Sequence, residues 1–245
     1  MLKKMKSVIK TPEIEFLCYS DLKDIIPEPT PANKSLPDWY KKLPQYTNGI
    51  QGETIKRCPP FLDALTLGWT IPLAADLKVK VNDDGSQIDF DSRVDFSLVE
   101  NHRIEQITSE KSPNPICPVQ PLKFINHWMI KVPKDYSVLF VSPFKNEETR
   151  FTCMPGVVHC DEYNNFVNFP FIFNVRNYEG IIEAGTPLVQ AIPIKRDTSI
   201  KKSSVRSMNE NEMMENEKTS RKQKVHMSYY RDFIWKPKLK SEKSK

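Results

Sequence analysis

The side chains best suited to chemistry in this chain stand together in "GVVHCDEY", where His159, Cys160 and Asp161 are consecutive. A histidine exchanges a proton near neutral pH, and a nearby carboxylate can orient it or share that proton. If the protein is an enzyme, His159 and Asp161 are therefore the candidate catalytic residues.

Thiol and metal chemistry have weaker support. Cys153, His159 and Cys160 lack the paired spacing of a zinc site, and adjacent residues of a strand point to opposite faces. The five cysteines are odd in number and scattered, which fits reduced thiols in a cytoplasm better than a disulfide framework. We expect no metal site and no resident cofactor.

Three carboxylates in "DFDSRVD", those of Asp89, Asp91 and Asp95, share one face if the segment is extended. Such a set can hold Mg²⁺, but it is more often the solvated face of a hairpin. The chain has no Walker A loop, no dinucleotide-binding glycine fingerprint and no nucleophile elbow. Most large enzyme classes are thereby excluded.

The elements that must position these residues are short strands. The chain has 245 residues, of which 39% are hydrophobic, with 20 prolines and only 7 glycines. This composition supports a core and disfavours long helices. Short apolar or alternating runs between turn signals predict an all-β, mainly antiparallel domain over 58–197, in the form of a distorted β-barrel. In "GIIEAGTPLVQAIPI", Gly185 is expected to make the turn between two strands, with Pro187 and Pro193 marking the ends of the second.

The two ends of the chain differ from this domain. Residues 1–57 hold one strand and an extended proline-rich arm, and residues 198–245 hold a polar linker and an aromatic tail. Val225, Tyr229 and Phe233 recur at i, i+4 and i+8, which predicts a short amphipathic helix stopped by Pro237. We expect aromatic residues of both ends to form an interface with the domain or with another subunit: Trp39, Tyr40, Tyr229, Tyr230, Phe233 and Trp235.

The charge pattern limits the partners. The net charge is +5, and much of the lysine excess lies near the two termini. Solvated ends explain this better than a nucleic-acid groove. No apolar run is long enough to cross a bilayer, and the basic start is not followed by a long hydrophobic region. We therefore expect neither a nucleic-acid nor a membrane partner, and a cytoplasmic protein.

Several motifs in 62–194 resemble those of the trimeric deoxyuridine triphosphatase (dUTPase) family, whose barrel is a β-clip. The similar segments are "HWMIKVPKDYSVLFVSPFKN", "PGVVHCDEYNNFVNFPFIFNVRN" and "IIEAGTPLVQAIPI". The resemblance implies a β-clip fold and a homo-oligomer, with a trimer as one form. It places His159 where the family has a catalytic Asp, and it implies that Lys145, Tyr163 and Gln190 are ligand-binding residues.

The departures from the family pattern argue against its activity. The phosphate-binding "PRSS" of the family is "PFKN" here, so the arginine and the serine hydroxyls are lost. The family closes its site with a glycine-rich C-terminal arm, but no glycine follows Gly185 in this chain. A relative without catalytic activity fits the sequence better.

Three hypotheses follow. The favoured one is a non-enzymatic assembly or interaction protein whose ends reach a partner, and a phage-encoded component of a virion fits this layout. The second is a protein that binds or hydrolyses a nucleotide or another phosphorylated small molecule, in which case Mg²⁺ is expected. The last is an Fe²⁺ and 2-oxoglutarate oxygenase built on His159, Asp161 and His226, although His226 follows a polar stretch and not a strand.

Overall fold

A computed structural model describes residues 12–47, 52–101, 122–144, 147–198, 200 and 202–236. The chain divides into two compact units, described separately below. Unit 1 comprises Met1–Pro37 and Leu65–Ser199, and unit 2 comprises Asp38–Ala64 and Ile200–Lys245. The division predicted from composition, at 57 and 197, differs because residues 38–64 group with the C-terminal segment.

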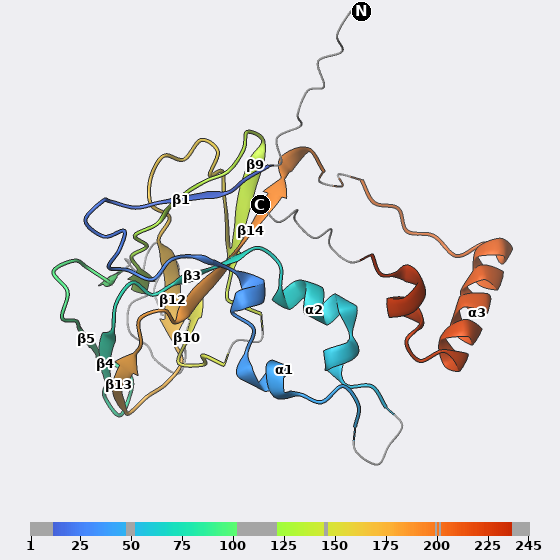
Figure 1. Ribbon diagram of the computed structural model, residues 1–245, viewed down its shortest axis with the longest axis horizontal. Coiled ribbons are helices and arrows are strands. Elements are labelled where there is room, and N and C mark those ends of the chain that lie inside the picture. The colour runs from blue at the N-terminus through green and yellow to red at the C-terminus, as the bar shows by residue number, and fades with distance from the viewer. Residues whose placement is uncertain are drawn as a thin grey trace, which may run out of the picture. The chain divides into compact units, whose positions relative to one another are not determined.

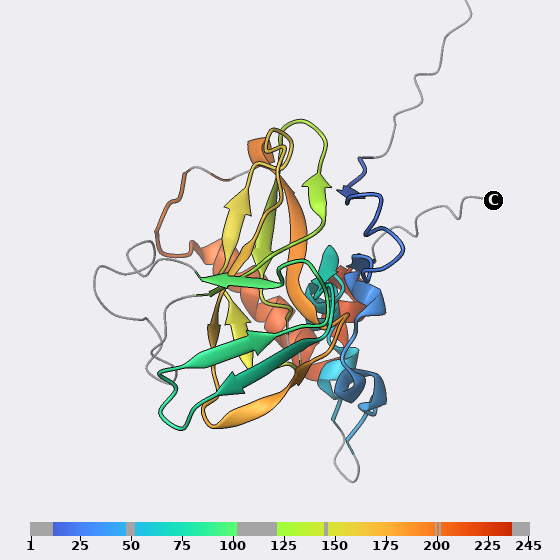
Figure 2. The same cartoon turned by 90° about the vertical axis from the view of Figure 1, so that its left-hand side faces the viewer.

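The described residues of unit 1 form four sheets (Figures 1 and 2). The largest has the order β11 (Gly156–Val158), β9 (Tyr136–Val141), β14 (Pro187–Lys195), β3 (Trp69–Pro72) and β2 (Thr30–Pro31). A four-stranded sheet has the order β10 (Phe151–Cys153), β12 (Phe169–Phe173), β7 (Leu122–Phe124) and β6 (Val99–Asn101). A third sheet contains β13 (Tyr178–Ile182), β4 (Leu77–Val81) and β5 (Ile88–Asp91), and β1 (Glu15–Leu17) pairs with β8 (Met129–Lys131). The described residues of unit 1 also contain the 3₁₀ turns η1 (Ala32–Lys34) and η4 (Arg196–Thr198).

Every strand pair in these sheets is antiparallel, which confirms the predicted fold class. Within the described residues each sheet keeps two open edges, so the strands do not join into a closed barrel. The sheets share one buried core instead: Phe140 of β9 meets Phe169 of β12, with ring centroids 5.5 Å apart. The same core contains a group of aromatic rings from the four-stranded sheet. Phe124 and Phe171 are fully buried and stack with their ring centroids 3.9 Å apart, and Phe151 meets Phe124 edge-on at 4.9 Å.

The turn into β14 follows the sequence-based expectation. Gly185 has a φ of 85°, a conformation that side chains rarely adopt, and it lies between β13 and β14. Pro187 begins β14 as expected, but Pro193 lies inside the strand, opposite Val138 of β9. It is tolerated there because the ladder between β14 and β3 ends at Ala191, so this part of β14 has one paired neighbour.

The first part of the proline-rich arm packs on unit 1 itself. Ile26 and Ala32 are buried, and the Ala32 amide donates to the Gly68 carbonyl at 2.9 Å. The indole N–H of Trp128 donates to the Pro27 carbonyl at 3.1 Å. This stretch of the arm is therefore a strap within the unit.

Unit 2 is helical. It contains α1 (Asp38–Lys42), η2 (Ile55–Arg57), α2 (Pro59–Leu65, which ends at the boundary with unit 1), α3 (Glu210–Val225) and η5 (Tyr230–Ile234), a single π-helical turn. Helix α3 begins with a reciprocal capping box between Asn209 and Glu212. None of the described helices combines the length and the apolar composition needed to cross a membrane.

The C-terminal helical segment differs from the predicted stripe. Val225 is the last residue of α3, and His226 leaves the helix with φ −120° and ψ 96°. The next helical turn begins only at Tyr230. The apolar spacing from Val225 to Phe233 therefore does not form one helical face, because the backbone breaks between the two elements.

Candidate functional site

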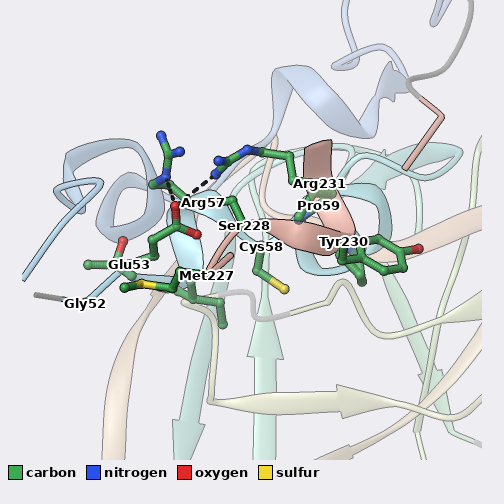
Figure 3. Close-up of a pocket in the computed structure, with 12 residues that line it drawn as sticks. Gly52, Glu53, Arg57, Cys58, Pro59, Met227, Ser228, Tyr230 and Arg231 are labelled. Carbon is green, nitrogen blue, oxygen red and sulfur yellow. Dashed lines mark hydrogen bonds and ion pairs between the residues drawn. The ribbon is translucent and has the colours of Figure 1, made fainter. Parts of the chain in front are cut away.

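A pocket of about 540 Å³ lies within unit 2 (Figure 3). Its lining comes from two stretches far apart in sequence, residues 52–60 and residues 227–231. The first stretch carries η2 and the start of α2, and the second leads into η5. The second stretch thus follows α3 along the chain, and the pocket exists only because the two stretches are held together.

Glu53 holds them together. Its side chain is 17% exposed, and its Oε1 accepts hydrogen bonds from Nε of Arg57 at 2.6 Å and Nη1 of Arg231 at 3.2 Å. The Ser228 hydroxyl donates to the same oxygen. Figure 3 shows the two arginine side chains converging on this carboxylate. A carboxylate removed from water is stable when it is paired in this way, so the cluster acts as a clip between the two stretches.

The clip continues into η5. Nε of Arg231 donates to Asp232 Oδ1 at 3.0 Å, and His226 Nε2 lies 2.8 Å from Asp232 Oδ2. The His226 and Phe233 rings also meet edge-on, with their centroids 5.2 Å apart. These contacts fix the turn that follows α3.

Much of the remaining pocket wall is apolar. Ile55, Met227 and Tyr230 line it and are exposed, and Pro59 and Pro60 line it as well. The Cys58 thiol also faces it and is exposed (Figure 3). The pocket therefore joins an accessible apolar surface to a charged rim.

The two arginines at the charged rim have N–H groups that can donate further hydrogen bonds. Arg57 Nη1 donates to Gln45 at 3.1 Å, and its guanidinium lies 4.8 Å from the Tyr46 ring centroid. Within the described part of the chain, no hydrogen bond engages Nη2 of Arg57 or Nη2 of Arg231. Each arginine can donate to a further acceptor, and a carboxylate suits that geometry.

We expect unit 2 to lose stability in acid because of Glu53. Desolvation raises the pKa of this carboxyl, but the bonds from Ser228, Arg57 and Arg231 outweigh it, so the pKa lies below its ordinary value of 4.5. A lowered pKa in the folded state adds stability above the unfolded-state pKa, and this stability is lost as the pH falls through the folded-state pKa. When the melting temperature is measured between pH 7 and pH 3, it should decrease once the pH is below about 4.5.

The control for this prediction is Glu53→Gln, which removes the titrating group. Its melting temperature should be lower than that of the wild type near neutral pH, and its decrease in acid should be smaller. An equally steep decrease in the variant would show that other carboxylates govern the acid response.

Asp161, a predicted catalytic residue, is used in an ion pair within unit 1. Its side chain is 3% exposed, and its two oxygens accept from Nη1 and Nη2 of Arg196 at 2.8 and 2.6 Å. The amide of Asp135 donates to it at 2.9 Å. The Arg196 guanidinium holds the pKa of the Asp161 carboxyl well below its usual range, so this group stays charged and bound.

The other predicted site residues of unit 1 do not converge. His159 and Tyr163 are exposed in the turn that holds Asp161, where the Tyr163 amide donates to the His159 carbonyl at 2.9 Å. Gln190 is opposite Val141 at the far end of β9, whereas Arg196 and its partner Asp161 adjoin Tyr136 at the near end. Five residues of a strand separate these ends, which is about 17 Å.

The Gln190 side chain is also hydrogen-bonded to backbone groups. It is 2% exposed; its Nε2 donates to the Leu67 carbonyl at 2.5 Å, and its Oε1 accepts from the Phe144 amide at 3.2 Å. Lys145, the remaining predicted ligand residue, lies outside the described residues. The ligand-binding role of these residues stays a prediction.

The predicted interface residues lie in unit 2, and several pack inside it. Tyr40 is buried, and Trp39 meets both Tyr40 and Phe61, with ring centroids 5.6 and 6.2 Å apart. The Trp235 indole donates to Asp63 Oδ2 at 2.8 Å. These aromatic side chains therefore contribute to the unit's own packing.

Tyr229, Tyr230 and Phe233 differ from that group. The Tyr229 and Phe233 rings are in contact, with centroids 5.2 Å apart, but Phe233 is 67% exposed and Tyr230 also remains exposed. These two side chains are accessible to a partner.

The remaining candidates from the sequence are the carboxylates of the acidic run and the cysteine Cys153, and their positions in the structure indicate structural roles. Asp89 and Asp91 are exposed on β5, opposite Lys80 and Lys78 of β4, as the solvated face of a hairpin. Cys153 is buried, and burial raises the pKa of its thiol. No group of three or more potential ligands gathers as a metal site anywhere in the part of the chain that the structure describes.

Comparison with known proteins gives a limited result. No family model matches the chain, and no curated protein sequence matches it. Among solved structures, a dUTPase mutant of Staphylococcus bacteriophage 80alpha with dUpNHpp is 12% identical over 55% of this chain and 92% of that chain, with a TM-score of 0.28. A dUTPase mutant from phage phi11 of S. aureus is 11% identical over 55% of this chain and 97% of that chain, with a TM-score of 0.27.

These matches are dUTPases, the family that the sequence motifs resemble. Because the TM-scores are well below 0.5, the likeness carries no argument about what this chain does. Its function must be inferred from its own geometry.

Proposed function

We propose that this protein is a non-enzymatic assembly protein that associates with further copies of itself through unit 2. The observation that supports this is a set of accessible apolar side chains in the pocket wall and on the helical turn η5. Its members are Ile55, Met227, Tyr230, Phe233 and Ile234, all of them exposed. We call these five residues the unit 2 apolar surface.

Isolated exposed apolar side chains are common, but several large ones gathered about a concave site usually mark an interaction surface. Burying apolar surface is favourable by about 25 cal/mol per Å². The clip around Glu53 fixes the turn that carries most of these side chains, so little ordering is needed when a partner binds.

The nucleotide hypothesis has less support. The residues that would form its pocket lie in part at opposite ends of β9, and Gln190 and Asp161 are already bonded within unit 1. A homo-oligomer, with a trimer as one form, is part of the proposal. A phage or virion origin remains a hypothesis from the sequence.

Sedimentation velocity over a concentration series tests the proposed function. We expect the full chain to associate, and Ile55→Ser with Phe233→Ser to raise the dissociation constant of self-association at least about tenfold. Val157→Ser with Ile181→Ser is the matched control, because it removes two exposed apolar side chains of unit 1. A wild-type chain that sediments as a 28.5 kDa monomer at every concentration would contradict the proposal. An equal effect of both double variants would also contradict it.

A further inference from the structure

Helix α3 is unusual because it has no buried face. It spans 16 residues, and none of them is buried. A helix exposed on all sides normally depends on its own caps and charge pairs. Here the capping box, the Arg206–Glu212 pair at 2.6 Å and the Arg221–Glu217 pair at 3.2 Å supply that support.

One face of α3 combines apolar and acidic side chains. Glu210, Met213, Met214 and Glu217 follow one another at i, i+3, i+4 and i+7, so they share a face. Met213 is 47% exposed and Met214 is 60% exposed. In the described part of the chain, Glu210 has no ion-pair partner. We call these four residues the acidic methionine face.

The pocket of unit 2 is complementary to that face. Its wall of Ile55, Met227 and Tyr230 suits methionines, whose flexible side chains fill irregular apolar surfaces. Its rim carries Arg57 and Arg231, each with an Nη2 group that can donate to a carboxylate. A helix with apolar anchors flanked by charge is the usual occupant of such a groove.

A helix cannot place this face in the pocket of its own chain. The second stretch of the pocket lining begins at Met227, two residues after α3 ends at Val225. Met213 lies twelve residues before Val225, which is about 18 Å along the helix at 1.5 Å per residue. The face therefore lies well away from the rim to which the helix is joined.

We infer that the acidic methionine face of α3 in one copy docks in the unit 2 pocket of a second copy. This inference rests on the proposed self-assembly and specifies how it occurs. The docked surfaces differ from each other, so the contact is heterologous and repeats from copy to copy, as a closed ring or an open chain. Because α3 is already capped, little of the binding energy is lost in ordering it.

Two variants separate the two surfaces. The helix variant, Met213→Gln with Met214→Gln, removes the apolar anchors and keeps good helix formers, so its helical circular-dichroism signal should be unchanged. The pocket variant, Ile55→Glu with Met227→Glu, changes two exposed positions and adds charges that repel the acidic face. Each alone should raise the dissociation constant of self-association at least about tenfold.

The decisive experiment mixes the two variants. Each has one intact surface, so the pocket of the helix variant can accept α3 of the pocket variant. In sedimentation velocity the equimolar mixture should form a species of twice the 28.5 kDa chain mass, which neither variant forms alone. A helix variant that associates as tightly as the wild type would overturn the inference, while self-assembly itself would stand.

Two other outcomes are informative. If both variants are monomeric and their mixture stays monomeric, docking of α3 in a second copy is wrong. If the wild-type chain itself never associates, the proposed self-assembly and this inference both fail.

Discussion

Replacing Gly68 with alanine is expected to destabilise unit 1 by at least about 3 kcal/mol. Gly68 precedes β3 and has a φ of 71°. A β-carbon there would lie 2.1 Å from the Ala191 carbonyl oxygen and 3.2 Å from the Ile192 α-carbon. Both neighbours belong to β14, so the backbone of that strand or of β3 must shift to admit a methyl group.

The shift would not remain local. The Gly68 carbonyl accepts the Ala32 amide and so anchors the proline-rich strap. Next to Gly68, the Leu67 carbonyl accepts from Gln190. Denaturant unfolding monitored by circular dichroism measures the loss.

Gly185→Ala is the matched control for this prediction. Gly185 has a φ of 85°, but a β-carbon there meets no atom within 4 Å. Its replacement should cost about 1 kcal/mol, from backbone strain alone. Equal losses in the two variants would show that the close approach of β14 to Gly68 does not matter.

Gln190→Ala is expected to destabilise unit 1 by roughly 2–4 kcal/mol. The change leaves the Leu67 carbonyl and the Phe144 amide without the bonds that this side chain makes, and it opens a cavity at a position 2% exposed. If the role of Gln190 were to bind a ligand, its replacement would instead weaken ligand binding and change the free energy of unfolding little. Denaturant unfolding of the ligand-free protein therefore distinguishes the two roles.

Gln87→Ala is the control, because Gln87 is an exposed glutamine on the way into β5. We expect its effect to stay within about 0.5 kcal/mol. If Gln190→Ala unfolds at the same denaturant concentration as Gln87→Ala, the structural role of Gln190 is wrong and a ligand-binding role regains support.

The sequence alone determined the fold class and most of the strands. Alternation in "LKVKV" becomes β4, with Leu77, Val79 and Val81 buried, because a strand that faces a core on one side must alternate. Gly185 makes the predicted turn, since only glycine adopts that φ without strain. The sequence analysis missed the start of α3, although Asn209 and Glu212 stand at capping-box spacing. Composition alone had indicated only a polar linker there.

The tertiary structure decided the sites. Glu53 and Arg57 are four residues apart, a spacing visible in the sequence, but Ser228 and Arg231 reach Glu53 from more than 170 positions away. The motif resemblance implied that Gln190 binds a ligand. It could not show that backbone groups of Leu67 and Phe144 already occupy its amide.

The physical reason is the range of the interactions. Strand periodicity and turn conformation depend on neighbours in sequence, so residue types report them directly. Whether a carboxylate or an amide is available for a ligand depends on which distant groups the folded chain brings within about 3 Å of it. Asp161 illustrates this, because a carboxylate two positions from a histidine in the sequence is bound in the folded chain by Arg196, 35 positions away.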